Sequence, residues 1–197
     1  MKTEEIILGN FQLKYPLEHL APLEQILFLD IETTGFISSE SAIYLIGCVF
    51  YSEGNWIIRQ WFAQSPDEES ELIRSFLAFA QRFSYLIHYN GNSFDLPFIK
   101  RKAGQYGLNC RFHEMEGLEI YRRIAPYKNF LKLSDCKLKT VELFLKVKRE
   151  DTFSGGELIR VYREFIFSHD YNLYHTLLQH NSDDMKGMLE ILPMLAY

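Results

Sequence analysis

The chain opens with a β-type pattern of hydrophobic positions and closes with a helical one. Residues 26–32, 42–52 and 55–64 are rich in β-branched and aromatic side chains, and Glu53-Gly54 separates the last two runs as a hairpin turn would. From residue 65 on, apolar residues recur at three- and four-residue spacing, which indicates amphipathic helices. The pattern predicts these further elements in order: a helix over 65–83, a strand over 85–90, a helix over 93–106, a weaker strand over 117–121, and helices near 138–145, over 155–167 and from about 169 to near the C-terminus.

This order of elements predicts an α/β fold with a mixed five-stranded sheet flanked by helices. Ser154 and Glu157 have the Ser-x-x-Glu form of a capping box at the start of the helix over 155–167. No repeat, low-complexity tract or Pro/Gly-rich linker interrupts the 197 residues. We therefore expect one domain over residues 1–197.

The composition is that of a globular protein, with 47% hydrophobic and 15% aromatic residues. No apolar run approaches the roughly 18 residues of a membrane-spanning helix, so we expect no membrane partner. The N-terminus carries early acids and no long apolar segment, unlike a secretory signal. Three widely spaced cysteines without a Cys-x-x-Cys pair favour reduced thiols and a cytoplasmic location.

Charge is unevenly distributed along the chain. The formal net charge of −5 would disfavour a polyanionic partner. Residues 122–149, however, contain nine Lys or Arg residues and only two acids. Such a basic segment can bind a phosphate backbone, or it can be the solvated face of amphipathic helices, and the sequence leaves both interpretations open.

The clearest chemical feature is ILFLDIETTG, residues 26–35. Side chains alternate along a strand, so Asp30 and Glu32 point to one face, about 7 Å apart. Two desolvated carboxylates repel each other unless a cation lies between them. A hard divalent metal with oxygen ligands meets that requirement. The alternative is a strand end at which both acids face water.

A second acid lies at the start of a helix. The segment HYNGNSFDLPFIKRKA, residues 88–103, follows the fourth strand, and Asn90-Gly91 forms a turn before Asp95 opens the helix. Asp95 therefore lies beyond the C-terminal edge of a strand, where α/β sheets bind ligands. An Asp in the first turn of a helix is also favoured by the helix dipole alone.

The last helix contains two candidate aspartates in QHNSDDMKG. At 100° per residue its apolar stripe comprises Tyr174, Leu177, Leu178, Met185, Met188, Leu189 and Leu192. Asp183 lies opposite this stripe, so we expect it to be solvated. Asp184 lies at the edge of the stripe, with His180 one turn earlier on the same side. A carboxylate packed against a core is costly unless it binds something, so Asp184 is the preferred ligand candidate and Asp183 the second. A surface His180–Asp184 pair is the alternative.

In combination these motifs resemble the DEDD exonuclease superfamily, which has a ribonuclease H-like fold. The matching features are the strand-borne Asp-x-Glu (30–32), the Asn-x-x-x-Phe-Asp (90–95) and the late His…Asp pair (180–184). The chain is most similar to the predicted ribonuclease H-like exonucleases of bacteria, through IYLIG (43–47), KLKTVELFLKVKRED (137–151) and SGGE (154–157) as well. The likeness extends from about residue 24 to residue 193.

The resemblance implies a two-metal 3′-to-5′ exonuclease that acts on single-stranded DNA or RNA ends. It assigns Asp30, Glu32, Asp95 and Asp184 as ligands of two Mg²⁺ or Mn²⁺ ions, and His180 as the general base. In related enzymes the loop after the first motif contacts the terminal nucleotide. The expected substrate-binding residues are therefore Thr33, Thr34, Gly35 and Phe36, together with Asn90 and with Lys137 and Lys139 of the basic segment.

One spacing departs from the family. The tyrosine branch has Tyr four residues before the last Asp and the histidine branch has His five before it, whereas His180 stands four residues before Asp184. The general base is thus the open point, and a catalytically weak or inactive nucleic-acid-binding module is the alternative function. A phosphatase is a third, although Asp30-x-Glu32-Thr33 lacks the Asp-x-Asp-x-Thr of haloacid-dehalogenase-type enzymes. A chain of this size has little room for targeting, so we also consider a protein partner; the oligomeric state stays open.

Overall fold

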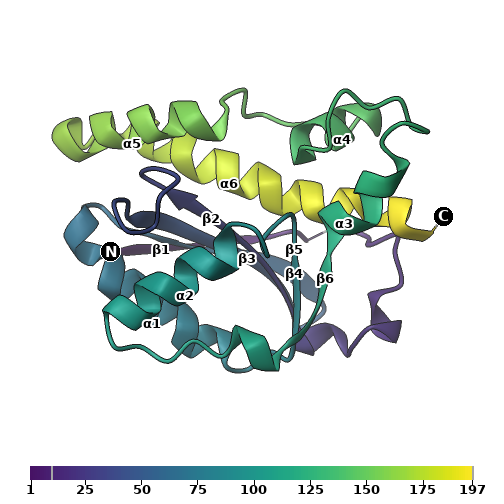
Figure 1. Cartoon of the computed structure of the whole chain (residues 1–197), viewed down its shortest axis with the longest axis horizontal. Coiled ribbons are helices and arrows are strands. Elements are labelled where there is room, and N and C mark those ends of the chain that lie inside the picture. The colour runs from purple at the N-terminus through teal and green to yellow at the C-terminus, as the bar shows by residue number, and fades with distance from the viewer. Residues whose placement is uncertain (10, 197) are drawn as a thin grey trace.

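The computed structural model describes residues 1–9 and 11–196 and contains one six-stranded sheet in the order β1-β4-β3-β2-β5-β6 (Figure 1). The strands are β1 (Lys2–Ile7), β2 (Ile26–Thr33), β3 (Ile43–Ser52), β4 (Asn55–Phe62), β5 (Tyr85–His88) and β6 (Glu116–Glu119). β1, β4, β3 and β2 pair antiparallel in turn, whereas β5 is parallel to both β2 and β6. The predicted mixed sheet and α/β class are confirmed.

The sheet has one strand more than the five predicted. The additional strand, β1, forms an edge and pairs with β4, with Lys2 opposite Phe62. All six residues of β1 are exposed, so backbone pairing rather than a buried face holds the strand. Tyr174 of the last helix also donates a hydrogen bond to Glu4 Oε1 at 2.8 Å. A strand without an apolar face has no hydrophobic periodicity that could be recognised in the sequence.

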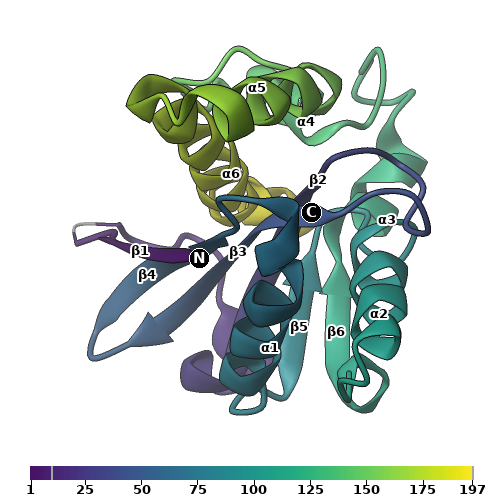
Figure 2. The same ribbon diagram turned by 90° about the vertical axis from the view of Figure 1, so that its left-hand side faces the viewer.

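Helices cover both faces of the sheet (Figure 2). They are α1 (Glu69–Ala80), α2 (Asp95–Gln105), α3 (Ile120–Ile124), α4 (Leu138–Phe144), α5 (Gly155–Ser168) and α6 (Tyr171–Ile191). α1 and α2 pack on one face, and α3, α5 and α6 pack on the other. α5 begins with the predicted capping box, in which the Glu157 carboxylate accepts hydrogen bonds from the backbone N–H and the hydroxyl of Ser154 at 2.8 and 2.7 Å.

The alternation of β2 directs its two acids. Leu29 packs in the core between the sheet and helices α1 and α2, whereas Phe28 packs in the core under α6. Asp30 and Glu32 continue the set to which Phe28 belongs, so both carboxylates point toward α6. The predicted apolar stripe of α6 is buried against the same face.

The structure bears on the expectations for the cysteines and for membrane-spanning helices. Cys48, Cys110 and Cys136 are all free thiols, as their wide spacing predicts. Within residues 1–9 and 11–196, no helix combines the length and the apolarity needed to cross a membrane.

A candidate metal centre at the end of the central strand

Carboxylates from three elements converge at the C-terminal end of β2. They are Asp30 and Glu32 of β2, Asp95 at the first position of α2, and Asp184 of α6. One ligand atom each from Glu32, His180 and Asp184 lie within 4.8 Å of one another. Asp95 Oδ1 accepts a hydrogen bond from the backbone N–H of Ile31 at 3.0 Å, which fixes the start of α2 against β2 between its two acids. The structure therefore brings the three sequence motifs together.

Burial and mutual repulsion raise the proton affinity of these acids. Desolvation raises the pKa of Asp30 well above its usual value, and the charges of Asp95 and Asp184 raise it further. Burial and Asp184 act in the same way on the pKa of Glu32. Burial also raises the pKa of Asp95 to about 7, against the hydrogen bond from Ile31. Divalent cations would relieve this repulsion, and carboxylate oxygens are the ligands that Mg²⁺ and Mn²⁺ prefer, so the donor set fits such ions.

A buried aspartate, Asp151, contacts the His180 ring on the side away from the carboxylate cluster. The sequence pattern did not identify this residue. His180 Nδ1 lies 2.7 Å from Asp151 Oδ2, and both side chains are almost fully buried. Since an ionised carboxylate only accepts hydrogen bonds, this contact places a proton on Nδ1. The other ring nitrogen, Nε2, lies 3.5 Å from Glu32 Oε1 and 3.4 Å from Asp184 Oδ2. The free nitrogen of His180 thus faces the carboxylate cluster.

Two basic residues complete this buried charge network. Lys139 Nζ lies 2.7 Å from Asp151 Oδ2 and also donates to the carbonyl oxygen of Phe153. Arg149 Nη1 lies 2.7 Å from Asp184 Oδ1 and 2.7 Å from Glu142 Oε2. These cations offset the negative charges of carboxylates that burial would otherwise keep protonated. Arg149 is thus in direct contact with Asp184, one of the four candidate ligands.

The expectation that Asp183 is solvated is wrong. Asp183 is buried, and its Oδ2 accepts hydrogen bonds from the backbone N–H groups of Glu150 and Asp151, each at 2.8 Å. Its Oδ1 accepts a further bond from Gln179. The helical projection considered only the sheet side of α6, but the loop that follows α4 covers the other side. Asp183 therefore fixes the loop that carries Arg149 and Asp151.

A polar bridge from α6 orients Asp30. Asn181 donates to Asp30 Oδ2 at 2.9 Å and accepts from Gln60 at 2.9 Å, spanning β2, β3 and β4. Gly47 of β3 lies opposite both Asp30 and Gln60 in the strand register, directly under the Asn181 amide. A Cβ at Gly47 would lie 1.9 Å from Asn181 Oδ1. An isolated glycine inside an apolar strand is a sequence signal from which this close approach could have been predicted.

A hollow of about 540 Å³ opens beside the carboxylates. Three predicted metal ligands and three predicted substrate contacts line it: Asp30, Asp95, Asp184, Phe36, Asn90 and Lys137. Phe36 is 74% exposed, and its ring centroid lies 6.4 Å from that of Phe94. An exposed ring next to acidic ligands is available for stacking against a bound base.

The other predicted substrate contacts lie outside this hollow. The Thr33 hydroxyl donates to the Gly35 carbonyl at 2.7 Å, and the Thr34 hydroxyl accepts from the backbone N–H of Ala42 at 2.9 Å. Both hydroxyl groups therefore form hydrogen bonds within the loop after β2 and stabilise its conformation. Lys139 directs its ammonium group to Asp151 rather than outward.

The fold and the site define a class, namely ribonuclease H-like α/β proteins with an acidic centre at the end of the central strand. Residues 27–196 match the RNase_H superfamily, and the chain belongs to this superfamily. Its fold is similar to that of the family B DNA polymerase from the hyperthermophilic archaeon Pyrobaculum calidifontis, with a TM-score of 0.69 and 19% identity. That match covers 89% of this chain but 25% of the polymerase, and at this identity it shows the fold alone. A comparison with curated proteins found no match.

Proposed function

We propose that the chain is a divalent-metal-dependent 3′-to-5′ exonuclease, organised as one domain over residues 1–197, that hydrolyses single-stranded DNA or RNA ends. The observation that carries this proposal is the convergence of Glu32, His180 and Asp184 within 4.8 Å, with Asp30 and Asp95 beside them. Acids contributed by three separate elements and buried together are costly for the fold. Their convergence is explained by a site that binds cations.

The ligand assignment follows from the donor set. Asp30, Glu32, Asp95 and Asp184 would hold two ions, and Mg²⁺ or Mn²⁺ would supply activation of the attacking water and stabilisation of the leaving oxygen. In this arrangement, Asp151 keeps the proton of His180 on Nδ1, so that Nε2 can accept the proton that the water gives up. This geometry supports His180 as the base despite its spacing from Asp184.

The loop after β2 and the hollow beside it define where the end of the nucleic acid would lie. In this proposal Phe36 stacks on the terminal base, and Asn90 and Lys137, which line the same hollow, contact the end of the chain. The bonds within the loop keep Thr33, Thr34 and Gly35 close to the acids of β2. We propose these residues as substrate contacts, with Lys139 acting through Asp151.

The test is digestion of single-stranded DNA and RNA oligonucleotides labelled at the 5′ or the 3′ end. With Mg²⁺ or Mn²⁺ we expect stepwise shortening from the 3′ end, and none in EDTA. Asp30→Asn and Asp184→Asn should reduce the rate by about 100-fold or more, the scale of losing a charge-stabilising group. Glu53→Gln, an exposed acid in the turn between β3 and β4 at the opposite end of these strands, is the control. Full activity of Asp30→Asn, or digestion in EDTA, would contradict the proposal.

One contact favours a second function, a nucleic-acid-binding module with little or no catalysis. Arg149 Nη1 lies 2.7 Å from Asp184 Oδ1, so the guanidinium already neutralises part of the negative charge of the acidic cluster. If this pair persisted, phosphate could bind without a metal ion. Tight oligonucleotide binding in EDTA, combined with no digestion in Mg²⁺ or Mn²⁺, would favour this function.

A further inference from the structure

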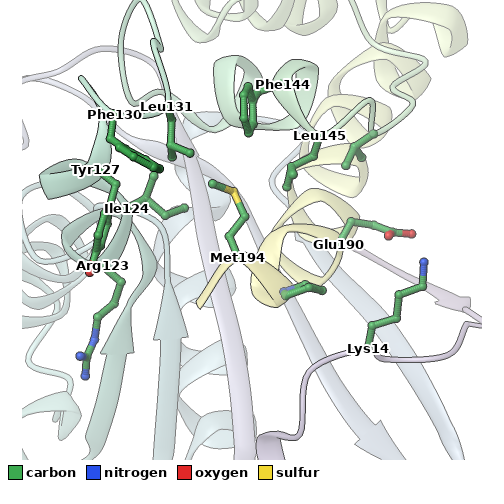
Figure 3. A pocket seen from close by; sticks show the side chains of 12 residues that line it. Lys14, Arg123, Ile124, Tyr127, Phe130, Leu131, Phe144, Leu145, Glu190 and Met194 are labelled. Atoms are coloured by element: carbon green, nitrogen blue, oxygen red, sulfur yellow. The ribbon is translucent and has the colours of Figure 1, made fainter. Parts of the chain in front are cut away.

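An apolar groove of about 600 Å³ lies at the C-terminal end of α6, outside the carboxylate site (Figure 3). Tyr127 and Phe130 line one side of it, Phe144 and Leu145 line another, and Met194 projects between them. Phe130 is 84% exposed and Tyr127 is 54% exposed. Large exposed apolar side chains gathered around a hollow are typical of a binding surface.

Two of the residues that line this groove are basic, and further basic residues lie close by in the sequence. Arg123 and Lys14 line it, and Glu190 is its one acidic lining residue among the described parts of the chain. Lys128 and Lys132 flank Phe130 in the segment YKNFLK, residues 127–132. Among the residues that the structure describes, six of the nine basic residues of segment 122–149 form no ion pair, and they are Arg123, Lys128, Lys132, Lys137, Lys146 and Lys148. Aromatic rings interleaved with free cations form a surface suited to an anionic chain that carries flat groups.

The groove and the carboxylate hollow share two helices. Tyr121 of α3 and Leu138, the first residue of α4, line the hollow. Ile124 of α3 and Phe144 at the end of α4 line the groove. A flexible chain with its end at the carboxylates can therefore continue along α3 and α4 into the groove.

Building on the proposed exonuclease function, we propose that this groove binds bases of the single-stranded nucleic acid upstream of the 3′ end. Bases would stack on Phe130 and Tyr127, and phosphates would lie near Arg123, Lys128 and Lys132. Stacking of this kind tolerates any sequence, because every base presents a π-face. An apolar protein surface seated here would leave these cations without compensation, so a polyanion is the better match.

The test compares a trinucleotide with a decanucleotide of the same base, since only the longer one reaches beyond the carboxylate hollow. Binding is measured by fluorescence anisotropy on the Asp30→Asn protein, and digestion on the otherwise unchanged chain. Phe130→Ala should weaken decanucleotide binding by about 5- to 150-fold, the range of one base–aromatic stack, and leave trinucleotide binding unchanged. Phe167→Ala, an 89% exposed phenylalanine on α5, is the matched control and should change neither.

The outcomes separate this proposal from the proposed function. Equal binding of both lengths, or a decanucleotide affinity that Phe130→Ala leaves unchanged, would overturn the groove assignment even if digestion proceeds. Length-dependent binding that requires Phe130, without digestion in Mg²⁺ or Mn²⁺, would support the groove and refute the exonuclease. A dimer in sedimentation that Phe130→Ala dissociates would instead identify the groove as a contact between copies of the chain.

Discussion

The close approach of α6 to the sheet leaves no room for a side chain at Gly47, beside the site. In Gly47→Ala the new Cβ would lie 1.9 Å from Asn181 Oδ1 and 2.6 Å from its Cγ. Both distances are below any tolerated contact, and Asn181 is fully buried, so its amide must move away. That movement breaks the bonds from Gln60 and to Asp30.

The loss of folding stability in Gly47→Ala follows from these contacts. Each buried polar group left without a partner costs about 1–3 kcal/mol, and forcing an extra carbon into a packed interior costs about 1–3 kcal/mol. We expect Gly47→Ala to lower the free energy of unfolding by about 2–5 kcal/mol. For a chain of this size that corresponds to a fall in Tm of about 5–20 °C. Denaturant titration and thermal melting measure both quantities.

A double-mutant cycle makes the reasoning refutable. Asn181→Ala removes the amide that clashes, so adding Gly47→Ala to Asn181→Ala should cost little further stability. The coupling between the two changes should therefore approach the whole cost of Gly47→Ala, about 2–5 kcal/mol. Gly104→Ala is the matched control, because a Cβ there meets nothing within 4 Å, and it should be neutral or stabilising by about 0.4–1 kcal/mol. Additive losses at positions 47 and 181 would show that the clash is not the cause.

Two further predictions concern the acids. The pKa of Asp95 is raised to about 7 in the fold, so its contribution to stability is full below about pH 4 and is lost as pH rises to about 7. Urea titrations in EDTA across this pH range should therefore show a steeper fall in the free energy of unfolding for the parent chain than for Asp95→Asn. Equal slopes for the two proteins would contradict the raised pKa of Asp95. Asp151→Asn should lower kcat about 10- to 100-fold with little change in KM, and it should alter the ¹⁵N chemical shifts of the His180 ring. An unchanged kcat together with unchanged His180 ring shifts would exclude a positioning role for Asp151.

The acids of the site could be predicted because local rules determine their directions. Alternation along β2 places Asp30 and Glu32 on one face, and the strand–turn–helix order places Asp95 at the edge of the sheet. The register of a buried strand is strongly specified by its hydrophobic pattern. Such positions need no knowledge of distant contacts.

The residues that were missed depend on contacts far apart in the chain. Asn181 reaches Asp30 across 151 positions, and His180 reaches Asp151 across 29. Asp183 was placed wrongly for the same reason, because a helical projection describes one helix and a sheet but not a loop packed on the opposite side. Edge strand β1 was missed because pairing, not burial, defines it.

The basic segment combines two functions that its composition alone does not separate. Six of its nine cations form no ion pair with any residue that the structure describes, but Lys139 and Arg149 turn inward and pair with Asp151, Glu142 and Asp184. Glu142 can take this position because Gly187 of α6 has no side chain, since a Cβ there would lie 1.7 Å from Glu142 Oε1.

Removing Arg149 would leave the buried Glu142 carboxylate without a compensating charge, at a cost of about 3–5 kcal/mol, so the Arg149 pairs hold the loop after α4 in one arrangement. That arrangement presents Asp151 to His180 Nδ1. The loop after α4 therefore orients the His180 ring through Asp151. The spacing of His180 from Asp184 along α6 does not by itself decide whether His180 can serve as the base.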